Sequence, residues 1–182
     1  MSLKAFIQQS FDMNRRALLQ NLQGLTEAEL AWKPAPHANS IGFLVWHMAR
    51  VEDGWILRVF QGKKHLWVTD AWAQKCGMPE DQRDMGYGYS QEQLDAFKTP
   101  SLDLLLAYSG AVRDATKSFL DQWSAESDTT ELKAPWGGTV LVKDILAQLV
   151  WELNQHGGQV GYVRGLQRGL ENPEYMGPLS DA

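Results

Sequence analysis

The chain has 182 residues, 44% hydrophobic and 21% charged, which is ordinary for a soluble globular protein. This length suits one domain, expected to span residues 1–182 and to bury about 70% of the surface that the unfolded chain exposes. The net charge of −5 argues against a nucleic-acid surface, which needs clustered Lys and Arg. One cysteine, Cys76, excludes an internal disulfide framework. Because no apolar run approaches the ~20 residues of a membrane span and the N-terminus lacks a signal-peptide core, we expect a cytoplasmic protein.

Two long helices are predicted in the first third of the chain. Apolar residues set a helical stripe from residue 3 to residue 22, and this helix should end before Gly24. The second helix should begin after Ser40, a predicted N-cap, and end near Gly62. It is apolar almost all round, which is typical of a helix in the middle of a bundle.

A connection of more than thirty residues, roughly 63–98, follows the second helix. Connections this long are uncommon in compact domains and often act as lids or binding loops. It contains Trp67, Trp72 and the stretch Gly86-Tyr87-Gly88-Tyr89, and a capping box at Ser90 and Gln93 predicts a short helix within it. We expect the loop from about Gly62 to Lys98 to border the functional site and to contact substrate through its aromatic side chains.

Two further helices complete the predicted bundle. Thr99 as N-cap and Pro100 as first helical residue predict the start of the third helix, which continues through Trp123. A break around residues 134–138 leads into Thr139-Val140-Leu141, a candidate extended piece, and the fourth helix should run from about residue 142 to residue 167. The fold class is therefore all-α, a four-helix bundle with a long loop between helices two and three.

Glu152 and His156 lie four residues apart in the last predicted helix. Residues at i and i+4 project from one face with Cβ atoms roughly 6 Å apart, so a carboxylate and an imidazole can bind one ion. The pair lies on the apolar stripe of the helix, which consists of Ile145, Leu149, Glu152, His156, Val160 and Val163. A charge on a buried face must be paired, hydrogen-bonded or bound to a metal, because an isolated one costs several kcal/mol.

A third ligand would complete a site of the catalytic zinc type, with the fourth position left for water or substrate. His47 is the best candidate because it lies in the middle of the buried second helix, whereas His37 and His65 fall in predicted loops. Trp46 and Trp151, each next to a proposed ligand, are expected to flank the site. A structural reading stays open, in which Glu152 and His156 form a buried ion pair without metal.

Several other residues are interpreted mainly as structural. Glu52 falls on the apolar stripe of the second helix and is expected to pair with an arginine rather than to orient a ligand. Arg164 is expected to make a surface salt bridge, with anion binding as the alternative. Gly157, Gly158 and Gly161 predict close packing against a neighbouring helix, because each costs up to ~1 kcal/mol relative to alanine. Cys76 is expected to be an inert small residue.

Segments 40–52 and 148–164, which contain Trp46-His47 and the run Glu152-Leu153-Asn154-Gln155-His156-Gly157-Gly158, resemble the DinB-like (YfiT-like) metalloenzyme family. The resemblance spans nearly the whole chain in order and spacing. It implies a four-helix bundle that holds a divalent metal, often zinc or nickel, through one histidine of the second helix and two residues four apart on the last. Many members have histidine where this chain has Glu152. The set His47, Glu152 and His156 resembles the zinc site of the mycothiol-dependent maleylpyruvate isomerase branch.

The resemblance implies a metal-dependent enzyme acting on a small molecule by thiol-dependent transfer, isomerisation or conjugation, with mycothiol or bacillithiol as the thiol. A metal-dependent hydrolase is the less favoured alternative, since a bound metal lowers the pKa of water toward ~7. The other alternative is a stress-related or homodimeric interaction module that binds metal or a small ligand without turnover. No membrane or nucleic-acid partner is expected.

Overall fold

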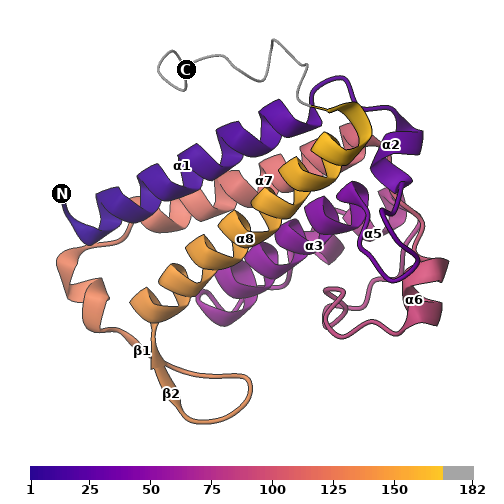
Figure 1. The fold of residues 1–182 in the computed structure, drawn as a ribbon. Coiled ribbons are helices and arrows are strands. Elements are labelled where there is room, and N and C mark those ends of the chain that lie inside the picture. The colour runs from indigo at the N-terminus through magenta and orange to yellow at the C-terminus, as the bar shows by residue number, and fades with distance from the viewer. Residues whose placement is uncertain (170–182) are drawn as a thin grey trace.

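The structure is a computed structural model that describes residues 1–169. Four long helical segments form its body, as Figure 1 shows. They are α1 (Leu3–Leu22), α3 (Ile41–Asp53) with its π-helical continuation η1 (Gly54–Val59), α7 (Leu102–Asp121) and α8 (Val142–Arg168). Both α1 and α3 pack against α7 and α8, so α1 and α3 occupy opposite corners of the bundle. The predicted all-α four-helix bundle is confirmed.

Short elements connect the four long helices. They are α2 (Glu27–Ala31), α4 (Leu66–Thr69), α5 (Trp72–Lys75), α6 (Gln91–Ala96), the 3-10 helix η2 (Ala125–Thr129) and the strands β1 (Glu131–Lys133) and β2 (Thr139–Leu141). The two strands pair antiparallel, with Glu131 opposite Leu141, and the hairpin projects from the end of the bundle where α8 begins. The extended piece predicted at residues 139–141 is confirmed as β2.

Serine caps fix where three of the long helices begin, with Ser2 as the N-cap of α1. Ser40 caps α3 as predicted, and its Oγ accepts a hydrogen bond from the Phe43 N–H at 3.2 Å. The prediction for the third long helix was wrong by two residues, because Ser101 rather than Thr99 is the N-cap of α7. Thr99 instead packs against α3, where a Cβ on Gly42 would lie 2.2 Å from its Cγ2.

The most buried of the long helices is α3, all of whose residues are buried. Burial extends to Glu52, whose carboxylate accepts hydrogen bonds from Arg113 at 3.0 Å and from the Thr116 hydroxyl at 2.5 Å. The expectation that Glu52 pairs with an arginine is therefore confirmed. The pair ties α3 to α7, away from the residues predicted to bind metal.

The long loop between α3 and α7 is folded rather than extended over the surface. It contains α4, α5 and α6, and Ser90 and Gln93 form the predicted capping box at the start of α6. Arg50, fully buried on α3, donates hydrogen bonds to the carbonyls of Asp81 and Asp84 at 2.9–3.1 Å. This guanidinium therefore holds residues 81–84 against the helix that carries His47.

Within residues 1–169, no helix is both long and apolar enough to cross a membrane. The homodimer and the cytoplasmic location stay predictions.

Candidate metal centre

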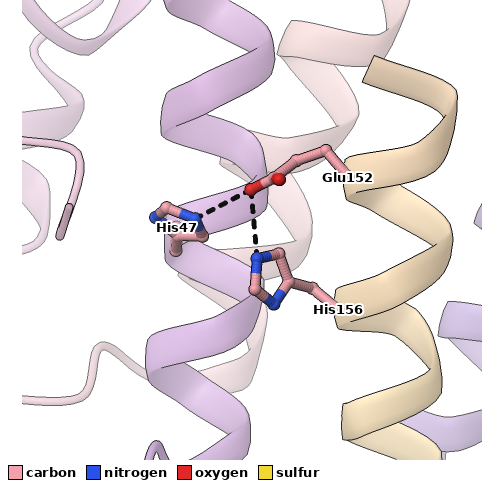
Figure 2. Close-up of side chains that lie close together, drawn as sticks. All are labelled: His47, Glu152 and His156. Carbon is pink, nitrogen blue, oxygen red and sulfur yellow. Dashed lines mark hydrogen bonds and ion pairs between the residues drawn. The ribbon is translucent and has the colours of Figure 1, made fainter. Parts of the chain in front are cut away.

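Three side chains from two helices converge between α3 and α8, as Figure 2 shows. The Nε2 atoms of His47 and of His156 each lie 3.0 Å from the same oxygen, Oε1 of Glu152. One donor atom from each residue lies within 4.8 Å of the other two. The structure thus brings together all three residues that the sequence analysis selected, and their role as metal ligands stays a proposal.

The two helices position these side chains by ordinary packing. Glu152 and His156 share one face of α8 at i and i+4, and that face packs against α3. On the neighbouring side of α8, Asn14 of α1 donates a hydrogen bond to the Leu153 carbonyl at 2.7 Å. A Cβ on Gly157 would lie 3.1 Å from the Asn14 amide nitrogen, so glycine allows this close approach directly after His156.

A backbone carbonyl of the long loop orients the His47 ring. The His47 Nδ1–H donates to the carbonyl of Met85, which can only accept. The loop reaches this position through Gly86, which has φ +81°, and a Cβ there would lie 2.7 Å from Cζ of Phe43. The Phe43 ring stacks on the imidazole with a centroid separation of 6.1 Å and an interplanar angle of 4°.

His156 is oriented in the same way by a side chain of its own helix. Its Nδ1 lies 2.7 Å from the amide oxygen Oε1 of Gln159, so the Nδ1–H donates to that oxygen. In both histidines the hydrogen of a neutral ring is therefore on Nδ1, and the Nε2 lone pair faces Glu152. A second interaction that fixes the Nδ1 tautomer is the usual arrangement around a metal-bound histidine.

Proton counting shows that this centre needs positive charge. Two neutral Nε2 lone pairs and a carboxylate oxygen are all acceptors, so at 3.0 Å they repel unless protons or a cation lie among them. In the metal-free protein, hydrogen bonds from His156 and then His47 hold the pKa of Glu152 at about 2. The same carboxylate raises the pKa of His156. A divalent ion would supply the same charge without the protons.

The donor set fits a divalent metal of the zinc type. Two imidazole nitrogens and one carboxylate oxygen are common zinc ligands, and three protein ligands leave one position open. Glu152 itself is buried, with 6% of its surface exposed, and His156 is half-buried. Nickel also accepts imidazole and carboxylate donors.

Two cavities meet at Glu152 and Tyr87. The first, called here the apolar cavity, has a volume of about 350 Å³ and is lined mainly by Trp55, Val59, Met85, Trp136 and Leu149. The second, called the histidine cavity, has a volume of about 260 Å³ and is lined by the two histidines together with Asn39, Trp151 and Gln155. The Tyr87 side chain is 77% exposed, and its ring centroid lies 5.9 Å from that of His47. The centre is therefore open to small molecules from two sides.

The expectation that the long loop borders the site is confirmed for its segment Met85–Gly88. The loop tryptophans do not take part: Trp67 is buried, and the Trp72 ring packs against Tyr108. Substrate contact through Tyr87 stays a prediction.

The two tryptophans expected to flank the site differ in position. Trp151 is 58% exposed and lines the histidine cavity, as expected. The expectation was wrong for Trp46, which is buried against Trp67 and Phe97 in the core. Successive helical residues point about 100° apart, so Trp46 faces the core while His47 faces α8.

Arg164 and the glycines of α8 also required correction. Arg164 is buried, and it donates to the carbonyls of Asn21 at 2.7 Å and Gln23 at 3.0 Å. It therefore closes the C-terminal end of α1, so the expected surface salt bridge was wrong. Close packing against α1 is confirmed for Gly157 and Gly161, whereas a Cβ on Gly158 would meet nothing.

Cys76 lies apart from the metal centre and lines neither cavity. The thiol is partly buried, and burial raises its pKa, which disfavours the reactive thiolate. The reading of Cys76 as an inert residue agrees with this environment.

The bundle and its His, Glu, His centre define a DinB-like helical fold with a metal-type site. The sequence model of the family described as mycothiol-S-transferase matches residues 6–169, so the chain belongs to that family. Among solved structures, the chain is similar to a conserved protein from Enterococcus faecalis, with 26% identity and a TM-score of 0.79 over 91% of this chain and 97% of that one. No curated protein sequence gives a significant match.

Proposed function

We propose that this protein is a metal-dependent thiol transferase in which His47, Glu152 and His156 hold one divalent ion, zinc or nickel. The observation that carries the proposal is the convergence of two Nε2 lone pairs on one carboxylate oxygen, with both Nδ1 hydrogens donated elsewhere. Such an arrangement needs added protons or a cation, and a divalent ion supplies that charge without the protons. Family membership supports a thiol as the second reactant. Mycothiol is the thiol that the family description names.

The proposed reaction joins the thiol to an electrophilic small molecule. The sulfur forms a bond to the electrophilic carbon, the bond from that carbon to the leaving group breaks with its electron pair, and the thiol proton passes to solvent. When bound, a divalent ion favours the thiolate over the thiol by its positive charge. The protein contributes the fixed ligand set, and Tyr87 and Trp151 border the approach to it.

Met85 and Gln159 act as positioning residues in this proposal. By accepting the Nδ1 hydrogens they keep each ring turned so that Nε2 faces Glu152. Hydrolysis by a metal-bound water could use the same ligands. The family match favours thiol transfer over hydrolysis, and over metal binding without turnover.

Transfer can be tested on protein stripped with chelator and reloaded with zinc or nickel. The stripped and loaded forms are incubated with mycothiol and an aromatic halide, and the thioether product is measured by mass spectrometry. We expect product from the loaded wild type and from Glu27→Leu, a control with the same chemical change at an exposed position of α2. Glu152→Leu should form product only at the uncatalysed rate.

The result that overturns the proposal is equal product formation with stripped, loaded and Glu152→Leu protein. Loaded wild type that forms no thioether with any thiol, but hydrolyses an ester or amide, would favour the hydrolase.

A further inference from the structure

The apolar cavity differs chemically from the histidine cavity that it meets. Its mouth is formed by two tryptophans, Trp55 of η1 and Trp136 of the β-hairpin turn, whose rings pack edge to face with centroids 5.6 Å apart and an interplanar angle of 76°. The volume of about 350 Å³ falls in the range of roughly 300–1,000 Å³ that is usual for small-molecule sites. Aromatic walls of this kind favour flat apolar ligands.

A π-helical segment shapes this wall. In η1 the Phe60 N–H bonds to the carbonyl of Trp55, five residues earlier, at 2.9 Å. Such segments are rare and occur frequently at functional sites. The segment begins at Gly54, where a Cβ would lie 3.2 Å from Sδ of Met85 and 3.4 Å from Cε1 of His65. A side chain at Gly54 would therefore press on the two residues that form this part of the cavity wall.

His65, on the same wall, carries an unused hydrogen-bond donor. The residue is 0% exposed and lines the apolar cavity. Its Nδ1 lies 3.3 Å from a guanidinium nitrogen of Arg50, which can only donate, so Nδ1 accepts and the hydrogen of the neutral ring is on Nε2. Nε2 has no hydrogen-bond partner among residues 1–169.

A buried donor without a partner is unfavourable, and it needs an explanation in a folded protein. Protonation of the ring would not satisfy this donor, because it adds a second N–H, and burial and the charges of Arg50 and Arg58 in any case lower the His65 pKa to about 4. Nε2 is closed to solvent in the unbound protein, so an acceptor on a molecule inside the cavity would satisfy the Nε2–H after a side chain of the same wall, such as the flexible Met85, shifts.

We propose that the apolar cavity binds the electrophilic reactant as an aromatic molecule with one hydrogen-bond acceptor, taken by the Nε2–H of His65, while the thiol enters through the histidine cavity. The two reactants then meet at Glu152 and Tyr87, which both cavities share. This assignment names the substrate class of the proposed transferase and rests on that function for its chemical meaning. The binding itself requires neither metal nor turnover.

The binding test uses two ligands of the same shape on metal-free protein. One is 2-acetylnaphthalene, which has a carbonyl acceptor, and the other is 2-isopropenylnaphthalene, in which a CH₂ group replaces that oxygen. Affinities are measured by ligand-observed NMR with calorimetry. We expect wild type to prefer the ketone by about tenfold, because the alkene leaves the buried donor unsatisfied.

Three variants locate the binding. His65→Leu should remove the preference for the ketone, so that both ligands bind alike. Trp136→Ala, at an exposed position of the cavity mouth, should lower the affinity for both ligands by about tenfold or more. Trp32→Ala changes another exposed tryptophan outside both cavities and should leave both affinities as in wild type. If His65→Leu fails to fold, Trp136→Ala and the ligand pair still decide the outcome.

Equal affinity for the two ligands in wild type, or unchanged binding in Trp136→Ala, would overturn the assignment. Steady-state kinetics of the loaded enzyme separate this failure from failure of the proposed function. We expect Trp136→Ala to raise KM for the aromatic reactant and Trp151→Ala to raise KM for the thiol. Active transferase with the two effects exchanged would mean that the function stands and the cavity assignment is wrong.

Discussion

Replacing Glu152 by leucine should abolish the stabilisation that a divalent ion gives to the folded protein. Glu152 is the oxygen donor of the centre, and it lies 3.0 Å from the Nε2 atoms of both histidines. Leucine fits the apolar neighbourhood of a residue that is 6% exposed, but it leaves two protein ligands. Glu152→His, by contrast, keeps three ligands and should retain metal-dependent stabilisation.

The size of the effect follows from linkage. An ion at 100 times its dissociation constant stabilises the folded state by about 2.7 kcal/mol. For a chain of this length, each kcal/mol raises the melting temperature by about 2–4 °C, so wild type should gain about 5–11 °C on metal loading. In chelator the leucine variant should melt within a few degrees of wild type or above it, because a well-packed apolar residue can replace a buried ion pair without loss.

The assay is a thermal melt, followed by circular dichroism, of each protein with chelator and with excess zinc or nickel. Wild type, Glu152→His and the exposed control Glu27→Leu should show the metal-dependent increase, and Glu152→Leu should show little of it. The same increase in wild type and Glu152→Leu would refute the reasoning. So would an unchanged melting temperature in wild type at saturating metal, with the leucine variant melting as high or higher.

Three further predictions concern residues around the centre. Glu52→Gln leaves Arg113 charged and buried without its partner carboxylate. The free energy of unfolding measured in urea should therefore fall by about 3–5 kcal/mol, and a decrease below about 0.5 kcal/mol would contradict the buried ion pair. Gly86→Ala and Gly88→Ala both place alanine at positive φ, but only Gly86 has close neighbours. Calorimetric titration should therefore show zinc affinity about tenfold lower in Gly86→Ala than in Gly88→Ala, and equal affinities would mean that the loop does not orient the ligand. His65 has a folded pKa of about 4, below its unfolded value of 6.5, so the unfolded chain binds the extra proton between these pH values. As pH falls from 6.5 to 4, the free energy of unfolding measured in urea should fall by on the order of 3 kcal/mol more in wild type than in His65→Gln. Parallel pH profiles of the two proteins would contradict a buried neutral ring.

The sequence was sufficient to predict the parts of the site that depend on local periodicity. Glu152 and His156 fall on the apolar stripe of one helix, so their common face follows from a spacing of four residues. Choosing His47 required a pairing between distant helices, which its position on an apolar helix and the resemblance to a family both favoured. The structure places it 3.0 Å from Glu152.

Other features could not be predicted because they depend on backbone atoms or on tertiary contacts. The acceptor for His47 is the carbonyl of Met85, and a backbone carbonyl has no residue-specific signal. The glycine-tyrosine stretch drew attention to this loop, but the need for glycine at position 86 arises only from its contact with α3. Arg164 was placed at the surface because its partners, the last carbonyls of α1, lie 143 residues away in the chain at Asn21 and nearby.

The most direct test of the metal centre is elemental analysis of protein purified without affinity-tag metals. Wild type should contain about one zinc or nickel ion per chain, and Glu152→Leu prepared in the same way should contain almost none. Wild type that remains metal-free after incubation with both ions, or Glu152→Leu with the same metal content as wild type, would contradict the assignment of His47, Glu152 and His156 as the ligands.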